Sequence, residues 1–152
     1  MAFSVKIRLA HEMDIPKMVE MGKKFHAITD YGFIPYDQDT ATRLFLTSIS
    51  HELCAVACNE DEVVGMLAGI KVPCLLNENV MVGTELAWWV EPEFRGGSAA
   101  IRMLDFIETQ AKEAGLAFWS MMCLEASKPD GLEALYMKRS YQRAERTFVR
   151  IL

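Results

Sequence analysis

The chain has 152 residues, of which 51% are hydrophobic and 24% are charged, which is enough for one domain with a sizeable core. Its net charge of −5 and the lack of a basic stripe argue against nucleic acid as a partner. No window approaches the ~20 apolar residues that a membrane helix needs, and the N-terminus does not resemble a signal peptide. We therefore expect a single cytoplasmic domain over residues 1–152, with neither a membrane nor a nucleic-acid partner.

The four cysteines do not indicate a metal site. Cys54 and Cys58 are separated by three residues within an apolar run, and neither a second pair nor a nearby pair of histidines completes a zinc set. We expect no metal, and we expect the cysteines to be small buried hydrophobic residues in a reducing compartment. The four are Cys54, Cys58, Cys74 and Cys123.

The first half of the chain predicts a strand, two helices and a β-hairpin. Residues 3–10 alternate loosely and are rich in strand-forming residues. Apolar residues recur at helical spacing over about 14–28 and 38–50, and Asp14 is suited to cap the first of these helices. Two apolar runs within 53–72 are joined by a polar turn, which predicts a hairpin.

After the hairpin, residues 73–83 are expected to form a loop and residues 84–90 a strand. A helix is predicted over about 98–114, because its apolar residues lie on one face. Gly115 is expected to end this helix.

The last third of the chain predicts two further strands around one helix. Residues 116–126 are almost continuously apolar, as expected of a strand that is covered on both faces. Ser127 is suited to cap a helix that ends near Arg139, and residues 144–152 are expected to form a final strand. The predicted order is β-α-α-β-β-β-α-β-α-β, which indicates an α+β or α/β-like fold with a mixed sheet.

Residues 94–100, with the sequence FRGGSAA, connect a predicted strand to a predicted helix. Gly96 and Gly97 allow successive backbone N–H groups to point into one concavity, and the positive end of the helix adds to that field. Arg95 adds a charge at the rim, so the segment suits a phosphate or pyrophosphate. Taken alone, it is equally consistent with a plain strand-to-helix turn.

Two motifs resemble those of the GNAT superfamily, the GCN5-related N-acetyltransferases. The segment VEPEFRGGSAA is similar to the acetyl-CoA-binding segment of that family, whose R/Q-x-x-G-x-G/A signature falls on Arg95, Ser98 and Ala100. The segment EALYMKRSYQ is similar to the family's L-Y-x-K-x-G-F/Y motif. Ser98 and Ser140 stand where the family usually has glycine.

The resemblance implies an α+β fold with a mixed central sheet of six to seven strands, about four helices, and splayed fourth and fifth strands. It also implies acetyl-CoA as the co-substrate. Backbone N–H groups of the loop would bind the pyrophosphate, and the edge of the preceding strand would pair with the pantetheine arm. The residues concerned are Trp88, Val90, Arg95, Gly96, Gly97, Ser98, Ala99 and Ala100.

The implied reaction is direct transfer of an acetyl group to a primary amine of a small molecule or protein that the sequence does not identify. Tyr136 matches the family's frequent general acid, and Glu85, Glu125 or a water relay would serve as the base. Burial in an apolar strand would raise the pKa of Glu85 toward working pH. The alternative is a non-catalytic acyl-CoA-binding or assembly protein of the same fold. Such folds often dimerise, so a homodimer is also open.

Overall fold

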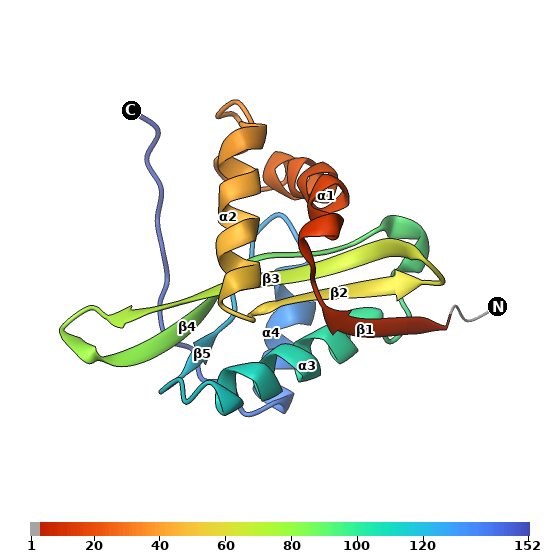
Figure 1. Cartoon of the computed structure of the whole chain (residues 1–152). Helices are drawn as coiled ribbons and strands as arrows, with labels where there is room; N and C mark the ends of the chain where they lie inside the picture. Colours follow the sequence, from red (N-terminus) through yellow and green to blue (C-terminus); the bar gives the residue numbers. More distant parts are fainter. Residues whose placement is uncertain (1–3) are drawn as a thin grey trace.

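The structure is a computed structural model that describes residues 4–152, and within them the chain forms one five-stranded sheet and four α-helices (Figure 1). The strands are β1 (Val5–Leu9), β2 (Cys54–Asn59), β3 (Glu62–Cys74), β4 (Asn77–Val90) and β5 (Trp119–Ser120). The helices are α1 (Ile15–Ala27), α2 (Gln38–Ser50), α3 (Ala99–Glu113) and α4 (Pro129–Lys138). The strands lie in chain order, and the first four are antiparallel whereas β4 and β5 are parallel. The predicted mixed α+β architecture is therefore confirmed.

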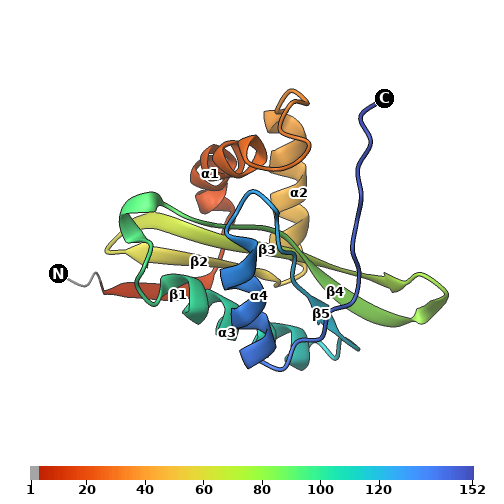
Figure 2. The same cartoon turned by 180° about the vertical axis from the view of Figure 1, so that it is seen from behind.

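Hydrophobic cores lie on both faces of the sheet, because successive strand residues point to opposite sides. Met66 packs with the α1 and α2 residues Met18 and Phe45, whereas its neighbour Leu67 packs with Met103 of α3. Figures 1 and 2 show α1 and α2 on one side of the sheet and α3 and α4 on the other. The sheet thus lies between two layers of helices.

The helices begin and end close to the predicted residues. Gly115 has a φ of +71° directly after α3, which confirms the predicted helix end. The start of α4 differs, because Lys128 takes the capping position with a φ of +46° and makes no side-chain cap. The hydroxyl of Ser127 caps nothing, so that prediction is wrong.

Asp14 precedes α1 as predicted, but its carboxylate does not cap that helix. It accepts hydrogen bonds from the Arg8 guanidinium at 2.7 and 2.9 Å and from the backbone N–H of His11 at 2.8 Å. The residue therefore ties β1 to the turn before α1. The strand was predicted from residue 3, which lies outside the described residues.

The loop predicted over residues 73–83 is wrong, because β3 and β4 continue through it as a long hairpin that turns at Leu75 and Leu76. Pro73 does not break the strand, since it lies at a register irregularity, where a missing N–H is tolerated. Figure 1 shows this hairpin extending beyond the rest of the sheet.

The C-terminal third departs most from expectation. Of the predicted strand 116–126, only Trp119 and Ser120 are strand residues, although Ala117 and Phe118 also form backbone hydrogen bonds with β4. Phe118 is 55% exposed rather than covered on both faces. Residues 144–152 have no strand partner among residues 4–152, so the sheet of this part of the chain has five strands and not six to seven. Strand-forming residue types are not sufficient, because a strand exists only where a neighbour completes its hydrogen bonds.

Within residues 4–152, no helix is long and apolar enough to cross a membrane. The same part of the chain has no group of three or more His, Cys, Asp or Glu side chains placed to hold a metal ion. Cys54 and Cys58 are buried as expected, whereas Cys123 is exposed.

Candidate functional site

The two parallel strands at the sheet edge separate after a very short ladder. Gly83 pairs with Trp119 and Thr84 with Ser120, after which β4 continues to Val90 with only β3 beside it. The Trp119 ring holds β5 in place by lying against Gly83, where a Cβ atom would approach the ring to 2.7 Å. Any larger residue at position 83 would push β5 away from β4.

The free edge of β4 presents backbone groups of Trp88 and Val90. The N–H of Glu91 donates to Val64 on β3 at 2.9 Å, and backbone groups alternate in direction along a strand. The N–H and C=O groups of Trp88 and Val90 therefore face away from β3. This edge can pair with an extended ligand through main-chain hydrogen bonds.

The loop after β4 carries a row of unused backbone donors. Gly96 has a φ of +82°, a conformation that favours glycine. Within residues 4–152, the N–H groups of Gly96, Gly97, Ser98, Ala99 and Ala100 donate no hydrogen bond. They lie at the N-terminus of α3, where the helix dipole favours an anion.

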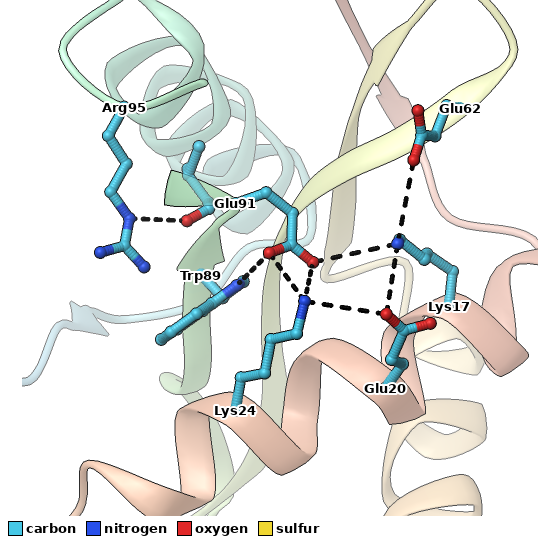
Figure 3. Close-up of polar contacts among 8 residues, drawn as sticks. Lys17, Glu20, Lys24, Glu62, Trp89, Glu91 and Arg95 are labelled. Carbon is cyan, nitrogen blue, oxygen red and sulfur yellow. Dashed lines mark hydrogen bonds and ion pairs between the residues drawn. The ribbon is translucent and has the colours of Figure 1, made fainter. Parts of the chain in front are cut away.

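The Arg95 side chain folds back instead of extending from the loop (Figure 3). Its Nε donates to the carbonyl of Val90 at 2.7 Å, and its guanidinium carbon lies 4.5 Å from the centre of the Trp89 ring. The Val90 carbonyl is thus already paired, which leaves the N–H of Val90 and both groups of Trp88 for a ligand.

A buried carboxylate anchors the end of β4 to α1 (Figure 3). Glu91 is 7% exposed and accepts hydrogen bonds from Lys24 at 2.8 and 3.0 Å, while Trp89 Nε1 lies 3.4 Å away. Burial alone would raise the pKa of Glu91, but these hydrogen bonds and the charges of Lys24 and Lys17 hold it below its usual value. No local sequence pattern predicts this pair, because 67 residues separate Lys24 from Glu91.

Glu85 and Tyr136 both form hydrogen bonds with the backbone of one residue, Met122, where β4 and β5 have separated. The backbone N–H of Met122 donates to the Glu85 carboxylate at 2.8 Å, and the Tyr136 hydroxyl donates to the Met122 carbonyl at 2.9 Å. Both side chains are buried, with Glu85 4% exposed. The structure therefore brings two of the three predicted catalytic residues together.

Burial sets the protonation of both groups. It raises the pKa of Glu85 to about 7, although the hydrogen bond from Met122 acts in the opposite direction. It also raises the pKa of the Tyr136 hydroxyl well above its usual value, with a smaller contribution from the charge of Glu85. A carboxyl that titrates near neutrality therefore lies close to a phenol that keeps its proton.

Glu125, the third predicted catalytic residue, lies in the exposed turn between β5 and α4 and makes no hydrogen bond or ion pair with residues 4–152. By contrast, Trp88 lies beside the buried pair, with its ring centre 6.5 Å from that of Tyr136. The indole N–H of Trp88 is buried and has no partner among the described residues. It is a donor that a bound molecule can satisfy.

The aromatic residues between α1 and α2 differ in burial: Tyr36 packs against α1, whereas Tyr31 and Phe33 are exposed. The Tyr36 hydroxyl donates to the carbonyl of Val19 at 2.8 Å, so this residue packs the segment. Burial is the main cause that raises the pKa of Tyr31.

The sequence matches the model of the Acetyltransferase (GNAT) family over residues 23–141. No curated protein sequence matches the chain. Among solved structures, it is similar to a predicted acetyltransferase from Clostridium acetobutylicum, solved with acetyl-CoA, at 22% identity and a TM-score of 0.72, covering 97% of this chain and 96% of that one. It is also similar to the ribosomal-protein-alanine N-acetyltransferase of Brucella melitensis biovar Abortus 2308, at 16% identity and a TM-score of 0.71, covering 98% and 99%.

A third similar structure is an aminoglycoside acetyltransferase from an uncultured soil metagenomic sample, at 15% identity and a TM-score of 0.72, covering 98% and 99%. At these identities the structural matches show a shared fold. The family match covers both the loop at 95–100 and Tyr136.

Proposed function

Because the chain belongs to the GNAT acetyltransferase family, we propose that it transfers an acetyl group directly from acetyl-CoA to a primary amine. The observation that carries this proposal is the pair of Glu85 and Tyr136, which contact the backbone N–H and the carbonyl of Met122 where β4 and β5 separate. A group that titrates near pH 7 and a protonated phenol are the base and acid that the reaction needs.

The residues of the site fit acetyl-CoA. The five unused N–H groups from Gly96 to Ala100 would bind its pyrophosphate at the start of α3. The open edge at Trp88 and the N–H of Val90 would pair with the amides of the pantetheine arm. The small side chains of Ser98, Ala99 and Ala100 let a bulky ligand approach the backbone.

The chain's own residues would move two protons. Glu85, directly or through a water molecule, would take a proton from the ammonium form of the acceptor, which frees the nitrogen lone pair. The new N–C bond forms as the C–S bond breaks, and the electron pair of the C–S bond goes to sulfur. The nitrogen then releases a second proton, which passes through water and restores the Tyr136 hydroxyl after that hydroxyl has protonated the thiolate. Tyr136 would give the thiolate its proton, for which its hydroxyl must leave the Met122 carbonyl. Its raised pKa keeps that proton available at neutral pH.

The acceptor would be bound on the side of Tyr31 and Phe33, the exposed aromatic residues that follow α1. The Glu85 carboxylate favours a cationic amine. The similar structures include enzymes named for a ribosomal protein and for aminoglycosides, so the proposal covers both small and protein acceptors.

The test is to follow thiol release from acetyl-CoA with a panel of amines, together with coenzyme A binding measured by calorimetry. Release that depends on an amine is expected. Binding without release on any amine would favour the non-catalytic acyl-CoA-binding protein instead. Absence of binding would refute both.

A further inference from the structure

The Tyr136 ring has two aromatic neighbours. Its centre lies 6.5 Å from that of Trp88 on β4 and 5.3 Å from that of Tyr141, which follows α4. The rings are inclined by 33° and 44°, so neither neighbour is stacked flat on Tyr136. All three residues pack in the hydrophobic core on the α3 side of the sheet. Ring contacts therefore hold Tyr136 in addition to its hydroxyl.

The hydroxyl alone cannot orient Tyr136 during the proposed reaction. In the structure it donates to the Met122 carbonyl at 2.9 Å, which is its one hydrogen bond within residues 4–152. The hydroxyl has to leave that carbonyl to protonate the thiolate, so this bond is lost at the step that needs the acid in place. A misplacement of about 1 Å at such a step costs about 10²-fold in rate. During that step the ring has to be held by its packing.

The end of α4 brings Tyr141 next to Tyr136. Ser140 has a φ of +65°, and the two hydrogen bonds of a Schellman turn follow from it. The N–H of Tyr141 donates to the carbonyl of Tyr136 at 3.0 Å, and the N–H of Ser140 donates to that of Met137 at 3.3 Å. This turn typically places the side chains of its first and last residues in contact, which here are Tyr136 and Tyr141. A left-handed backbone is unfavourable for serine, so further contacts have to hold the turn.

Such contacts tie Tyr141 to α3. Its hydroxyl donates to the carboxylate of Glu108 at 2.8 Å. The guanidinium of Arg139 pairs with the same carboxylate at 2.7 Å and also with Asp105, so Glu108 is itself fixed. Burial and the hydrogen bond to Glu108 raise the pKa of Tyr141 well above its usual value, so its hydroxyl keeps the proton that it donates. The ring beside Tyr136 is therefore held from both α3 and α4.

We propose that Tyr141 is a positioning residue for the general acid. Its ring keeps that of Tyr136 in one orientation while the Tyr136 hydroxyl turns from the Met122 carbonyl to the sulfur of coenzyme A. Glu108 belongs to α3, whose first residues would bind the pyrophosphate, so the acid is positioned relative to the same helix that would hold coenzyme A. This inference rests on the proposed function, because it takes Tyr136 as the acid.

The first test observes the Tyr136 ring directly and requires no acetyl transfer. The chain has four tyrosines, so labelling with 3-fluorotyrosine gives few fluorine NMR signals, and those that Tyr136→Phe removes belong to Tyr136. We expect these signals to broaden or split further in Tyr141→Leu, which removes the neighbouring ring, and to keep their wild-type width in Tyr141→Phe, which retains it. Signals of Tyr136 that are as narrow in Tyr141→Leu as in the wild type would overturn the proposal.

The second test is a double-mutant cycle on kcat, with an amine acceptor from the panel. Tyr141→Leu should lower kcat by about 10- to 10²-fold and leave the KM for acetyl-CoA unchanged, whereas Tyr141→Phe should keep most of the wild-type rate. When Tyr136→Phe is already present, Tyr141→Leu should have no further effect, because it has no acid left to position. Equal losses in both backgrounds would show that Tyr141 acts on the fold in general, which would contradict the proposal.

Two controls separate positioning from a general loss of structure. Tyr141→Leu should bind coenzyme A in calorimetry as the wild type does, and lost binding would refute a role limited to the acid. Arg143 also ties this segment to α4, through an exposed ion pair with Glu133, and Arg143→Gln should leave kcat unchanged. A loss as large as that of Tyr141→Leu would assign the effect to the segment and not to the ring. If Tyr136→Phe keeps the wild-type kcat, the proposed acid role fails, and with it the positioning role in catalysis.

Discussion

Replacing Glu85 with Gln removes the titrating group of the proposed site while keeping its shape. The Gln side-chain oxygen can still accept the hydrogen bond that Met122 donates to Glu85. The variant therefore changes the charge at position 85 and little else. We expect two consequences, one for the pH dependence of stability and one for acetyl transfer.

The stability effect follows from the raised pKa. Glu85 ionises near the ordinary value of 4.5 in the unfolded chain and near 7 in the folded protein. Below pH 4.5 both states hold the proton, so the stabilising contribution is then complete. Between pH 4.5 and 7 the unfolded state releases the proton first, so the free energy of unfolding falls by up to about 1.4 kcal/mol per pH unit. The total loss is about 3 kcal/mol, because the shift is about 2.5 pKa units.

Urea unfolding of the wild type and Glu85→Gln at pH 5 and pH 8 measures this effect. The wild type should lose about 2.5 kcal/mol more than the variant over that interval, because the unfolded carboxyl is already largely ionised at pH 5. Glu125→Gln is the matched control, since Glu125 is exposed, and it should behave as the wild type does. If Glu85→Gln loses as much stability as the wild type, the carboxyl does not titrate near neutrality and the reasoning fails.

Acetyl transfer gives the second readout. With Glu85 as the base, kcat should rise as pH increases through about 7 and fall by about 10²–10⁴-fold in Glu85→Gln. An acceptor amine also titrates and shifts the pH profile, whereas the unfolding experiment contains no acceptor. A normal rate in Glu85→Gln together with a tenfold or greater loss in Glu125→Gln would assign the base role to Glu125.

Three further substitutions test the rest of the site. Gly97→Glu should abolish coenzyme A binding in calorimetry, whereas Gly97→Ala should retain it. The fold tolerates a Cβ at position 97, because that atom has only one neighbour within 4 Å, at 3.9 Å. Binding by Gly97→Glu would refute the pyrophosphate site. Tyr136→Phe should bind coenzyme A normally and lower kcat, and an equal loss of both would contradict its role as the acid. Lys24→Met should lower the free energy of unfolding in urea by about 1 kcal/mol, because Glu91 stays buried without its main partner. The neighbouring exposed Lys23→Met should change it little, and equal effects would refute the Lys24–Glu91 anchor.

Local patterns predicted the helices well and the strands unevenly. The apolar spacing of α1 and α3 depends only on residues within one helix, and Gly115 ends α3 through its own backbone freedom. Strand pairing depends on residues far apart in sequence. The stretch at 73–83 contains Pro73 and looks like a loop, yet its pairing across the turn makes it a hairpin.

The site follows the same rule: features formed by adjacent residues are predictable from the sequence, whereas contacts between distant residues are not. The loop at 95–100 was found from adjacent residues, and the structure keeps its five backbone donors free. Glu85 and Tyr136 were each proposed singly, but their common partner, Met122, is the product of two tertiary contacts. The Lys24–Glu91 pair and the folded-back Arg95 depend on tertiary contacts that no motif in the sequence encodes.

One residue after β5 links the proposed base to the proposed acid. The backbone N–H of Met122 donates to Glu85 and its carbonyl accepts from Tyr136, although the ladder to β4 has already ended at Ser120. Both contacts use backbone atoms of the same residue, so a change in the direction of this backbone would displace the base and the acid together. We therefore expect the geometry of the site to depend on the conformation of this segment more than on the side chain of Met122.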